Sequence, residues 1–412
     1  MTSEGWYRSG FVYLLANIAV AAVNFGLIPF LIAYLSPAEY GKVGLFSLLT
    51  TIFSTFIGLE SLSALTRKIY DDKSSVEYRA RLTSTCLAIA FVSALLLAGA
   101  GAIALHLAPG FRSYVATDDL LWMAALSALL INIMRTRQVN WQVDGKIINF
   151  ASTQVLNALL AALLTVVFML YVMPTATARI LGIAIAASLL AAYGLLSLYR
   201  DGYLGWQYLN GAKGRSLMSY GIPLMPHSAG LFLISSFDRT FVAGYLSISQ
   251  FGVYLLATQF GSAISLFLDG INNALVPQIF SKLHGSGSAD QSRKRLRGLL
   301  RKAFLFPVVM VVLAAGVSRI VLSIFAGPYS AAAPPAVAIV LASSMLAPIY
   351  VFSNIALFHN RTKQLSLITT ISGTANLILV VLLTKIFGIN GAAASTAIAS
   401  GVRLALLYWM VR

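Results

Sequence analysis

The feature that most constrains this chain is a series of apolar stretches, each long enough to cross a bilayer as a helix. About 20 residues of helix span the ~30 Å hydrocarbon core of a membrane. Twelve stretches of about this length recur along the chain, at 10–35, 40–65, 82–106, 119–141, 150–173, 179–199, 217–246, 250–270, 303–325, 335–358, 366–387 and 391–411. Hydrophobic residues make up 58% of the chain and charged residues 10%. The sequence therefore predicts an all-α polytopic membrane protein with twelve transmembrane helices.

Lys and Arg residues are unevenly distributed between alternate loops. If the N-terminus is cytoplasmic, the cytoplasmic ends and loops hold 22 of the 29 basic residues. Basic residues concentrate in cytoplasmic loops of membrane proteins. We therefore expect both termini in the cytoplasm, and we attribute most of the net charge of +16 to this bias and to anionic membrane lipids.

The basic run RKRLRGLLRK at 293–302 lies between two apolar stretches, so it predicts a juxtamembrane segment and not a nucleic-acid site. The first apolar stretch is too long for a signal peptide. Cys86 is the single cysteine, which excludes an intramolecular disulfide. No metal or cofactor is predicted.

A short motif occurs twice, about half the chain apart. YLSPAEYGKVGLF at 34–46 returns 211 positions later as YLSISQFGVYLLA at 245–257. Weaker matches follow in the same order, including GIAIAAS against GAAASTA. The repeat predicts two six-helix bundles, 1–205 and 206–412, related by a pseudo-two-fold axis along the membrane normal. Transporters built in this way alternate access to a path between their bundles.

Three segments of the chain resemble a known family. They are FDRTFVAGYLSISQFGVYLLA at 237–257, FGINGAAASTAIASG at 387–401 and LSPAEYGKVGLFSL at 35–48. They resemble the Wzx-type O-antigen and capsule flippases, which are polysaccharide transporters of the multidrug/oligosaccharidyl-lipid/polysaccharide exporter superfamily.

The resemblance implies a flippase in a bacterial inner membrane. Such a protein moves undecaprenyl-diphosphate-linked oligosaccharide from the cytoplasmic to the periplasmic leaflet, and it works beside the polymerase and chain-length proteins of its pathway. The cargo is an anionic head group on a long apolar tail. Arginines suit the diphosphate because the guanidinium makes paired, charge-assisted hydrogen bonds.

Charged residues inside the apolar stretches are the candidate substrate ligands, because a charge in a membrane span usually faces a cavity. Asp238 and Arg239 are adjacent in the seventh stretch, so one of them is expected to face the substrate path, unless Arg239 is an interface anchor. Glu60 and Arg67 are seven residues apart, which predicts nearly one helix face. Arg67 is equally an ordinary cytoplasmic basic residue.

Three further arginines are candidate substrate ligands, but each could instead be an anchor at the membrane interface. Arg135 and Arg137 end the fourth stretch, near Asn140 and Trp141, and this group suits either a sugar or an interface anchor. Arg319 is a similar case in the ninth stretch.

The start of the seventh stretch carries helix-loosening residues. Gly221, Pro223 and Pro226 predict a kink or gate, because proline removes a backbone donor. His227 follows them, and it joins Glu60 and Asp238 as a candidate to carry a coupling proton or ion, or else it is satisfied by freed carbonyls.

Three function classes remain open at this point. The chain has no nucleotide-binding loop, HExxH motif or histidine cluster, so it is not predicted to be an enzyme. A lipid-linked oligosaccharide flippase is the main hypothesis. The alternatives are a cation or drug antiporter of the same superfamily and a membrane glycosyltransferase or polymerase.

Overall fold

The computed structural model describes residues 3–71, 75–107, 118–284, 294, 296–325 and 327–411. Within these ranges it does not place the side chains of residues 3–11, 71, 105–106, 118, 234, 274, 277 and 317–325. All regular structure in the described ranges is helical. The chain divides into two compact units: unit 1 is Met1–Leu35 with Lys42–Ser236, and unit 2 is Ser36–Gly41 with Phe237–Arg412.

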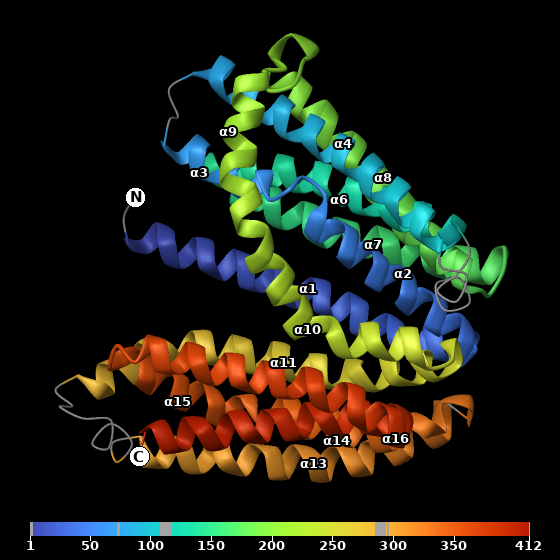
Figure 1. Ribbon diagram of the computed structural model, residues 1–412, viewed down its shortest axis with the longest axis vertical. Coiled ribbons are helices and arrows are strands. Elements are labelled where there is room, and N and C mark those ends of the chain that lie inside the picture. The colour runs from blue at the N-terminus through green and yellow to red at the C-terminus, as the bar shows by residue number, and fades with distance from the viewer. Residues whose placement is uncertain are drawn as a thin grey trace. The chain divides into compact units, whose positions relative to one another are not determined.

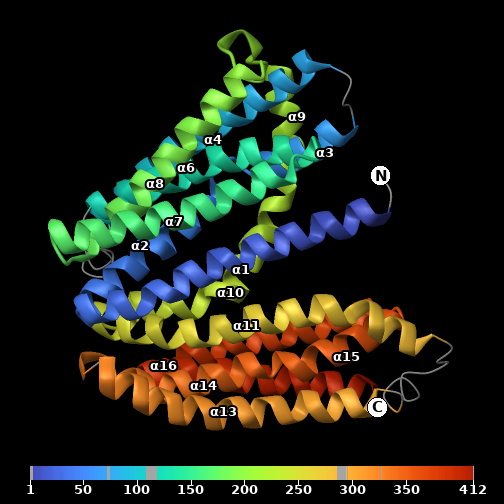
Figure 2. The same ribbon diagram turned by 180° about the vertical axis from the view of Figure 1, so that it is seen from behind.

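Unit 1 holds the helices of the first half of the chain and the start of α10 (Figures 1 and 2). They are α1 Ser3–Tyr34, α2 Pro37–Phe56, α3 Ser61–Asp71, α4 Val76–Leu107, α6 Asp118–Val143, α7 Ile147–Tyr171, α8 Ala176–Arg200, α9 Gly211–Gly221 and α10 Met225–Tyr245, with 3-10 turns η1 Trp206–Tyr208 and η2 Ile222–Leu224. α8 packs on α6 and α7, and α1 packs on α7. Small residues allow this close packing, since a Cβ on Gly182 of α8 would lie 2.9 Å from the backbone nitrogen of Thr165.

Unit 2 holds the first residues of α2, up to Gly41, then the end of α10 and the helices that follow it. These are α11 Ile248–Leu283, α13 Arg297–Phe325, η3 Gly327–Ala332, α14 Ala333–Ser344, α15 Leu346–Phe358 and α16 Thr362–Val411. α14 packs on α11, α13 and α16. In unit 1, α6 packs on α3, α4, α7 and α8.

The repeated motif forms the same turn in both copies. α1 ends at Tyr34 and α2 begins at Pro37, and 211 positions later α10 ends at Tyr245 and α11 begins at Ile248. Ser36 and Ser247 cap the new helices, with Oγ accepting from the backbone N–H groups of Glu39 and Gln250.

The two glycines of the motif explain why it recurs. A Cβ on Gly41 would overlap the carbonyl oxygen of Ile248, and one on Gly252 would overlap that of Pro37. Both close approaches lie within unit 2, where the first turns of α2 and α11 pack backbone against backbone. The glycines are needed because no side chain fits at either position.

Nine helices of the described residues are long and apolar enough to cross a membrane, or eleven if each bent helix pair counts as one span. The predicted number of twelve is not reached by this criterion. The difference lies in α16, which covers the last two predicted stretches in a single 50-residue helix interrupted at Gly388. A Cβ on Gly391 would overlap the carbonyl oxygen of Leu383, so the chain turns back on itself at Gly388.

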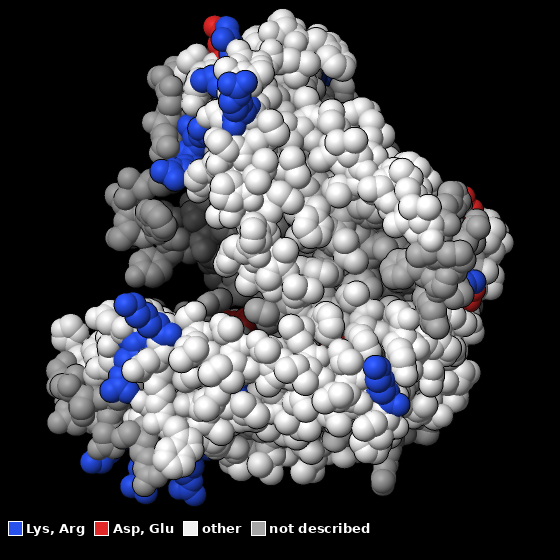
Figure 3. Space-filling model, in the orientation of Figure 1, with Lys and Arg blue, Asp and Glu red and all other residues white. Residues whose placement is uncertain are grey.

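Lys and Arg side chains gather at the ends of the helices in each unit (Figure 3). In unit 1 they lie over the ends of α3, α4 and α9, and in unit 2 where α11 ends and α13 begins. The surface between these ends is largely uncharged, as expected for helices in lipid. The bundle boundary at 205/206, the symmetry axis and the cytoplasmic position of the termini stay predictions.

Candidate binding site: a polar cavity in unit 1

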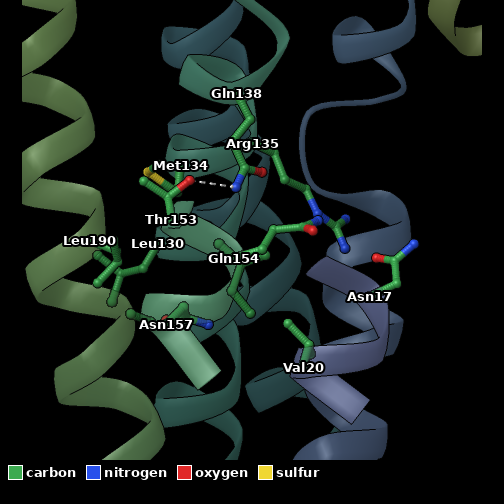
Figure 4. Close-up of a pocket in the computed structure, with 12 residues that line it drawn as sticks. Asn17, Val20, Leu130, Met134, Arg135, Gln138, Thr153, Gln154, Asn157 and Leu190 are labelled. Carbon is green, nitrogen blue, oxygen red and sulfur yellow. Dashed lines mark hydrogen bonds between the residues drawn. The ribbon is translucent and has the colours of Figure 1, made fainter. Parts of the chain in front are cut away.

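Four helices of unit 1 enclose a polar cavity of about 240 Å³. The lining residues are Asn17 and Val20 of α1, Leu130, Ile131, Met134, Arg135 and Gln138 of α6, Thr153, Gln154 and Asn157 of α7, and Ala187 and Leu190 of α8 (Figure 4). This volume is below the ~300–1,000 Å³ of sites for drug-sized ligands. The cavity therefore suits a head group and not a whole oligosaccharide.

Arg135 is the charged residue among the described lining residues. It lies on α6 eight residues before the helix ends at Val143, about 12 Å inside at the usual rise. Its side chain is exposed although it belongs to a membrane span, and so is that of Asn17. Exposed polar groups at this depth indicate a face of the unit that meets water and not lipid.

Amide side chains surround the guanidinium. Figure 4 shows Arg135 and Gln154 extending toward the side of the cavity where Asn17 lies. Gln138 Nε2 donates to Thr153 Oγ1 over 3.3 Å, which joins α6 to α7. Gln154 Oε1 is buried without a hydrogen-bond partner among the described residues. The cavity thus offers a cationic donor beside an unpaired acceptor, a combination that fits an anionic group bonded to a hydroxylated one.

Glu60 lies in a break between α2 and α3. Gly58, Leu59 and Glu60 all have positive φ, of 82°, 50° and 56°. The turn is held from outside: the N–H of Gly58 donates to Ser93 Oγ over 2.8 Å, and Ser228 Oγ of α10 donates to Glu60 Oε1 over 2.5 Å. Left-handed Leu and Glu are unfavourable and persist only where their surroundings impose them.

The break changes how Glu60 relates to the two arginines. Glu60 precedes α3, so it does not share a helix face with Arg67, and that expectation was wrong. Arg67 is exposed on α3, with its guanidinium 5.2 Å from the ring centre of Tyr220. Glu60 is near enough to Arg135 for the two charges to interact, but it is not among the residues that line the cavity.

Arg137 is separated from Arg135 by the helix geometry. It is 2% exposed, forms an ion pair with Asp201, and lies over the ring of Trp141 at 4.7 Å. It does not line the cavity. Residues two apart on a helix point about 200° apart, that is, to nearly opposite sides, so Arg135 faces the cavity while Arg137 anchors α6 to the end of α8.

The seventh predicted stretch begins with a change of helix type. The 3-10 turn η2 occupies Ile222–Leu224, directly after Gly221 and around Pro223. A Cβ on Gly221 would overlap the carbonyl oxygen of Leu59, so this region packs tightly on the break at Glu60. Pro226 and His227 are exposed at the start of α10, next to the Ser228 that binds Glu60. Whether these residues act as a gate stays a prediction.

Asp238 and Arg239 belong to unit 2 and are not part of this cavity. Tyr254 of α11 donates to Asp238 Oδ2 over 2.6 Å, and Nε of Arg239 is buried without a partner among the described residues. Arg319 lies in α13, and its side chain is outside the described part of the chain.

Gln138, Thr153 and Gln154 are site residues that the sequence analysis did not select. A signal was available, because Gln154 and Asn157 stand three residues apart in an apolar stretch and therefore share a helix face. Uncharged polar residues also hold membrane helices together, so the pattern alone did not separate binding from packing.

Comparisons with known proteins agree with this architecture. The family described as "Polysaccharide biosynthesis protein" matches residues 7–284, which is more than half of the chain. The chain belongs to this family. It is also 25% identical over 376 residues to an "Uncharacterized membrane protein" of Haemophilus influenzae, covering 88% of this chain and 86% of that protein.

Solved transporter structures share the fold of this polysaccharide biosynthesis protein. "Lipid II flippase MurJ, inward closed conformation" matches with a TM-score of 0.68 at 15% identity, covering 99% of this chain and 87% of that chain. An inward-facing multidrug resistance MATE family transporter of the MOP superfamily matches with a TM-score of 0.62, also at 15% identity, covering 97% and 93%. The protein is thus a multi-pass membrane protein of the polysaccharide biosynthesis family, and it shares the fold of the MurJ and MATE structures.

Proposed function

We propose that the protein flips an undecaprenyl-diphosphate-linked oligosaccharide from the cytoplasmic to the periplasmic leaflet of a bacterial inner membrane by alternating access. The observation that carries the proposal is the unit 1 cavity, in which Arg135 stands among amides inside an apolar helical unit. The family and the similarity to the lipid II flippase support the same class of cargo.

The cavity chemistry favours a phosphate-containing head group. A guanidinium makes paired, charge-assisted hydrogen bonds to phosphate oxygens, and these are stronger where water is partly excluded. The amide nitrogens of Gln154 and Asn157 can donate to the remaining phosphate oxygens. A drug cation would instead require carboxylates, and none is among the described residues that line the cavity.

The decisive experiment combines deletion of the gene with lipid analysis. Under the proposal, cells lacking the protein accumulate a polyprenyl-diphosphate oligosaccharide on the cytoplasmic face of the membrane. Complementation with Arg135→Gln is expected to reduce export at least tenfold at wild-type protein levels. The matched control is Arg200→Gln, which removes an exposed arginine at the end of α8 outside the cavity.

Two outcomes would reject the proposal. If no lipid-linked glycan is trapped in the deletion strain, the proposed cargo is wrong. If Arg135→Gln exports normally, the proposed binding site is wrong. A changed drug-resistance profile in the deletion strain, with no trapped lipid, would favour the antiporter alternative.

A further inference from the structure

A second polar cluster lies inside unit 2, where α11, α15 and α16 supply its residues. Tyr350 of α15 donates a hydrogen bond to Asp269 Oδ1 of α11. One helical turn further along both helices, Asn354 Nδ2 donates to Asn272 Oδ1 over 2.9 Å. The two pairs form a ladder between α11 and α15 with rungs about 5 Å apart.

Hydrogen bonds between membrane helices can serve packing alone, but the exposure of Asp269 indicates that this carboxylate can also bind a ligand. Asp269 lies within the membrane span Ile248–Asn273, and its side chain is exposed on unit 2. Asp269 stands four residues before the end of this span, where a carboxylate is still costly against lipid, so we expect it to face water. Tyr350 occupies one of about four lone-pair positions of the carboxylate, which leaves the others able to accept hydrogen bonds.

The cluster also contains donors and an apolar wall. Nε of Arg403 on α16 is buried without a hydrogen-bond partner among the described residues, and Arg403 lies near enough to Tyr350 for the two groups to interact electrostatically. Tyr350 and Asn272 border a cavity of about 150 Å³, whose other walls include Ile271 and Val351. Acceptors, donors and an apolar surface thus lie together.

We infer that this cluster binds the glycan part of the cargo. A sugar ring presents neighbouring hydroxyls at its edge and C–H groups on its faces. Asp269 can accept from two such hydroxyls, the amides and Arg403 can bind the remaining oxygens, and the apolar wall can cover a ring face. The inference rests on the proposed function and divides the recognition: the arginine cavity of unit 1 takes the diphosphate, and the carboxylate cluster of unit 2 takes the sugar.

The test compares two probes on the purified full-length protein in lipid nanodiscs. One probe is undecaprenyl diphosphate, and the other is the lipid-linked glycan extracted from cells in which the gene is deleted. For each protein we take the ratio of the two dissociation constants. Wild type is expected to bind the glycosylated lipid at least tenfold more tightly than undecaprenyl diphosphate alone.

The variants separate the two sites. Asp269→Asn and Tyr350→Phe are expected to bring the ratio close to one while leaving the affinity for undecaprenyl diphosphate unchanged. Arg135→Gln is expected to weaken both probes by the same factor and to keep the ratio. Asp119→Asn and Tyr193→Phe are matched controls at exposed positions of unit 1, and they should behave as wild type.

Each remaining outcome is decisive. A wild-type ratio of one, or an unchanged ratio in both Asp269→Asn and Tyr350→Phe, would overturn the glycan site while the flippase function stands. Equal weakening of both probes by these variants would instead assign the cavity to the prenyl chain. Failure of the wild-type protein to bind either probe would reject the proposed function itself. Tyr350→Phe keeps the test valid if Asp269→Asn does not fold.

Discussion

The second and eighth predicted spans are copies of one element, but only the first copy is broken. The two helices begin alike at Pro37 and Ile248. The first is interrupted by the left-handed residues Gly58 to Glu60, while the second, α11, continues for 36 residues to Leu283. At the repeat spacing of 211, Gly58 corresponds to Asp269.

Both copies therefore carry a carboxylate at a similar position along the repeat, but they hold it differently. Glu60 projects from a turn and accepts hydrogen bonds from Ser63 and from Ser228 of α10. Asp269 projects from a continuous helix and accepts from Tyr350. A duplicated pair of helices can therefore carry two unlike sites. The break lets the carboxylate of Glu60 bind Ser228, a residue 168 positions further along the chain.

The largest loss of stability is expected from a substitution that adds a side chain next to the helix break at 58–60. In Gly221→Ala the new Cβ would overlap the carbonyl oxygen of Leu59 and lie 2.9 Å from the carbonyl carbon of Glu60, and backbone atoms cannot yield as a flexible side chain does. We expect a loss of about 3 kcal/mol or more, measured as a lower thermal midpoint in detergent. Gly230→Ala on α10 is the control, because its Cβ would meet nothing within 4 Å. Equal stability of the two variants would contradict the tight contact.

A pair of alanine substitutions compares the broken and continuous helices directly. Gly58→Ala places a side chain at φ 82° and is expected to destabilise the protein by about 1–2 kcal/mol. Gly270→Ala in α11 adds a Cβ in open space within a helix and is expected to stabilise it by about 0.5–1 kcal/mol. The opposite signs, measured by thermal unfolding, test whether the break exists in the membrane-embedded protein.

The smallest effect concerns the link from Glu60 to α10. Ser228→Ala removes one donor to the carboxylate, which should cost about 1 kcal/mol. Ser188→Ala removes a hydroxyl that bonds within its own helix, to the carbonyl oxygen of Ala184, and it should be nearly neutral. If Ser228→Ala were as stable as Ser188→Ala, the link would contribute nothing measurable to the fold.

Much of the helical layout follows from sequence alone. An apolar stretch of about 20 residues has to form a helix in lipid, since lipid offers no partner for a free backbone group. The motif at 34–46 and its copy also predicted matching turns, and Ser36 and Ser247 cap helices at the same spacing. The break at 58–60 was not predicted, because nothing local makes Leu59 and Glu60 left-handed; the contacts with Ser93, Gly221 and Ser228 do so.

The candidate site was predicted only in part. Arg135 was selected together with Arg137, and only the packing of α6 turns one toward the cavity and the other toward Asp201. Gln154 and Asn157 were not selected, and they line the cavity with Arg135 only because α1, α6, α7 and α8 pack together. Asp269 was not selected as a site residue, and its pairing with Tyr350 joins residues 81 positions apart.

By itself the sequence determined that this protein lies in a membrane as helices, that its hairpin is duplicated, and that it resembles polysaccharide flippases. These properties depend on hydrophobic length, local caps and short motifs, which are readable along the chain. Only the tertiary structure decided which polar side chains face a common space, because that depends on how each helix is rotated against its neighbours. Rotation is set by packing between distant segments, so a cavity with one arginine and a cluster around one exposed aspartate became visible only in the folded units.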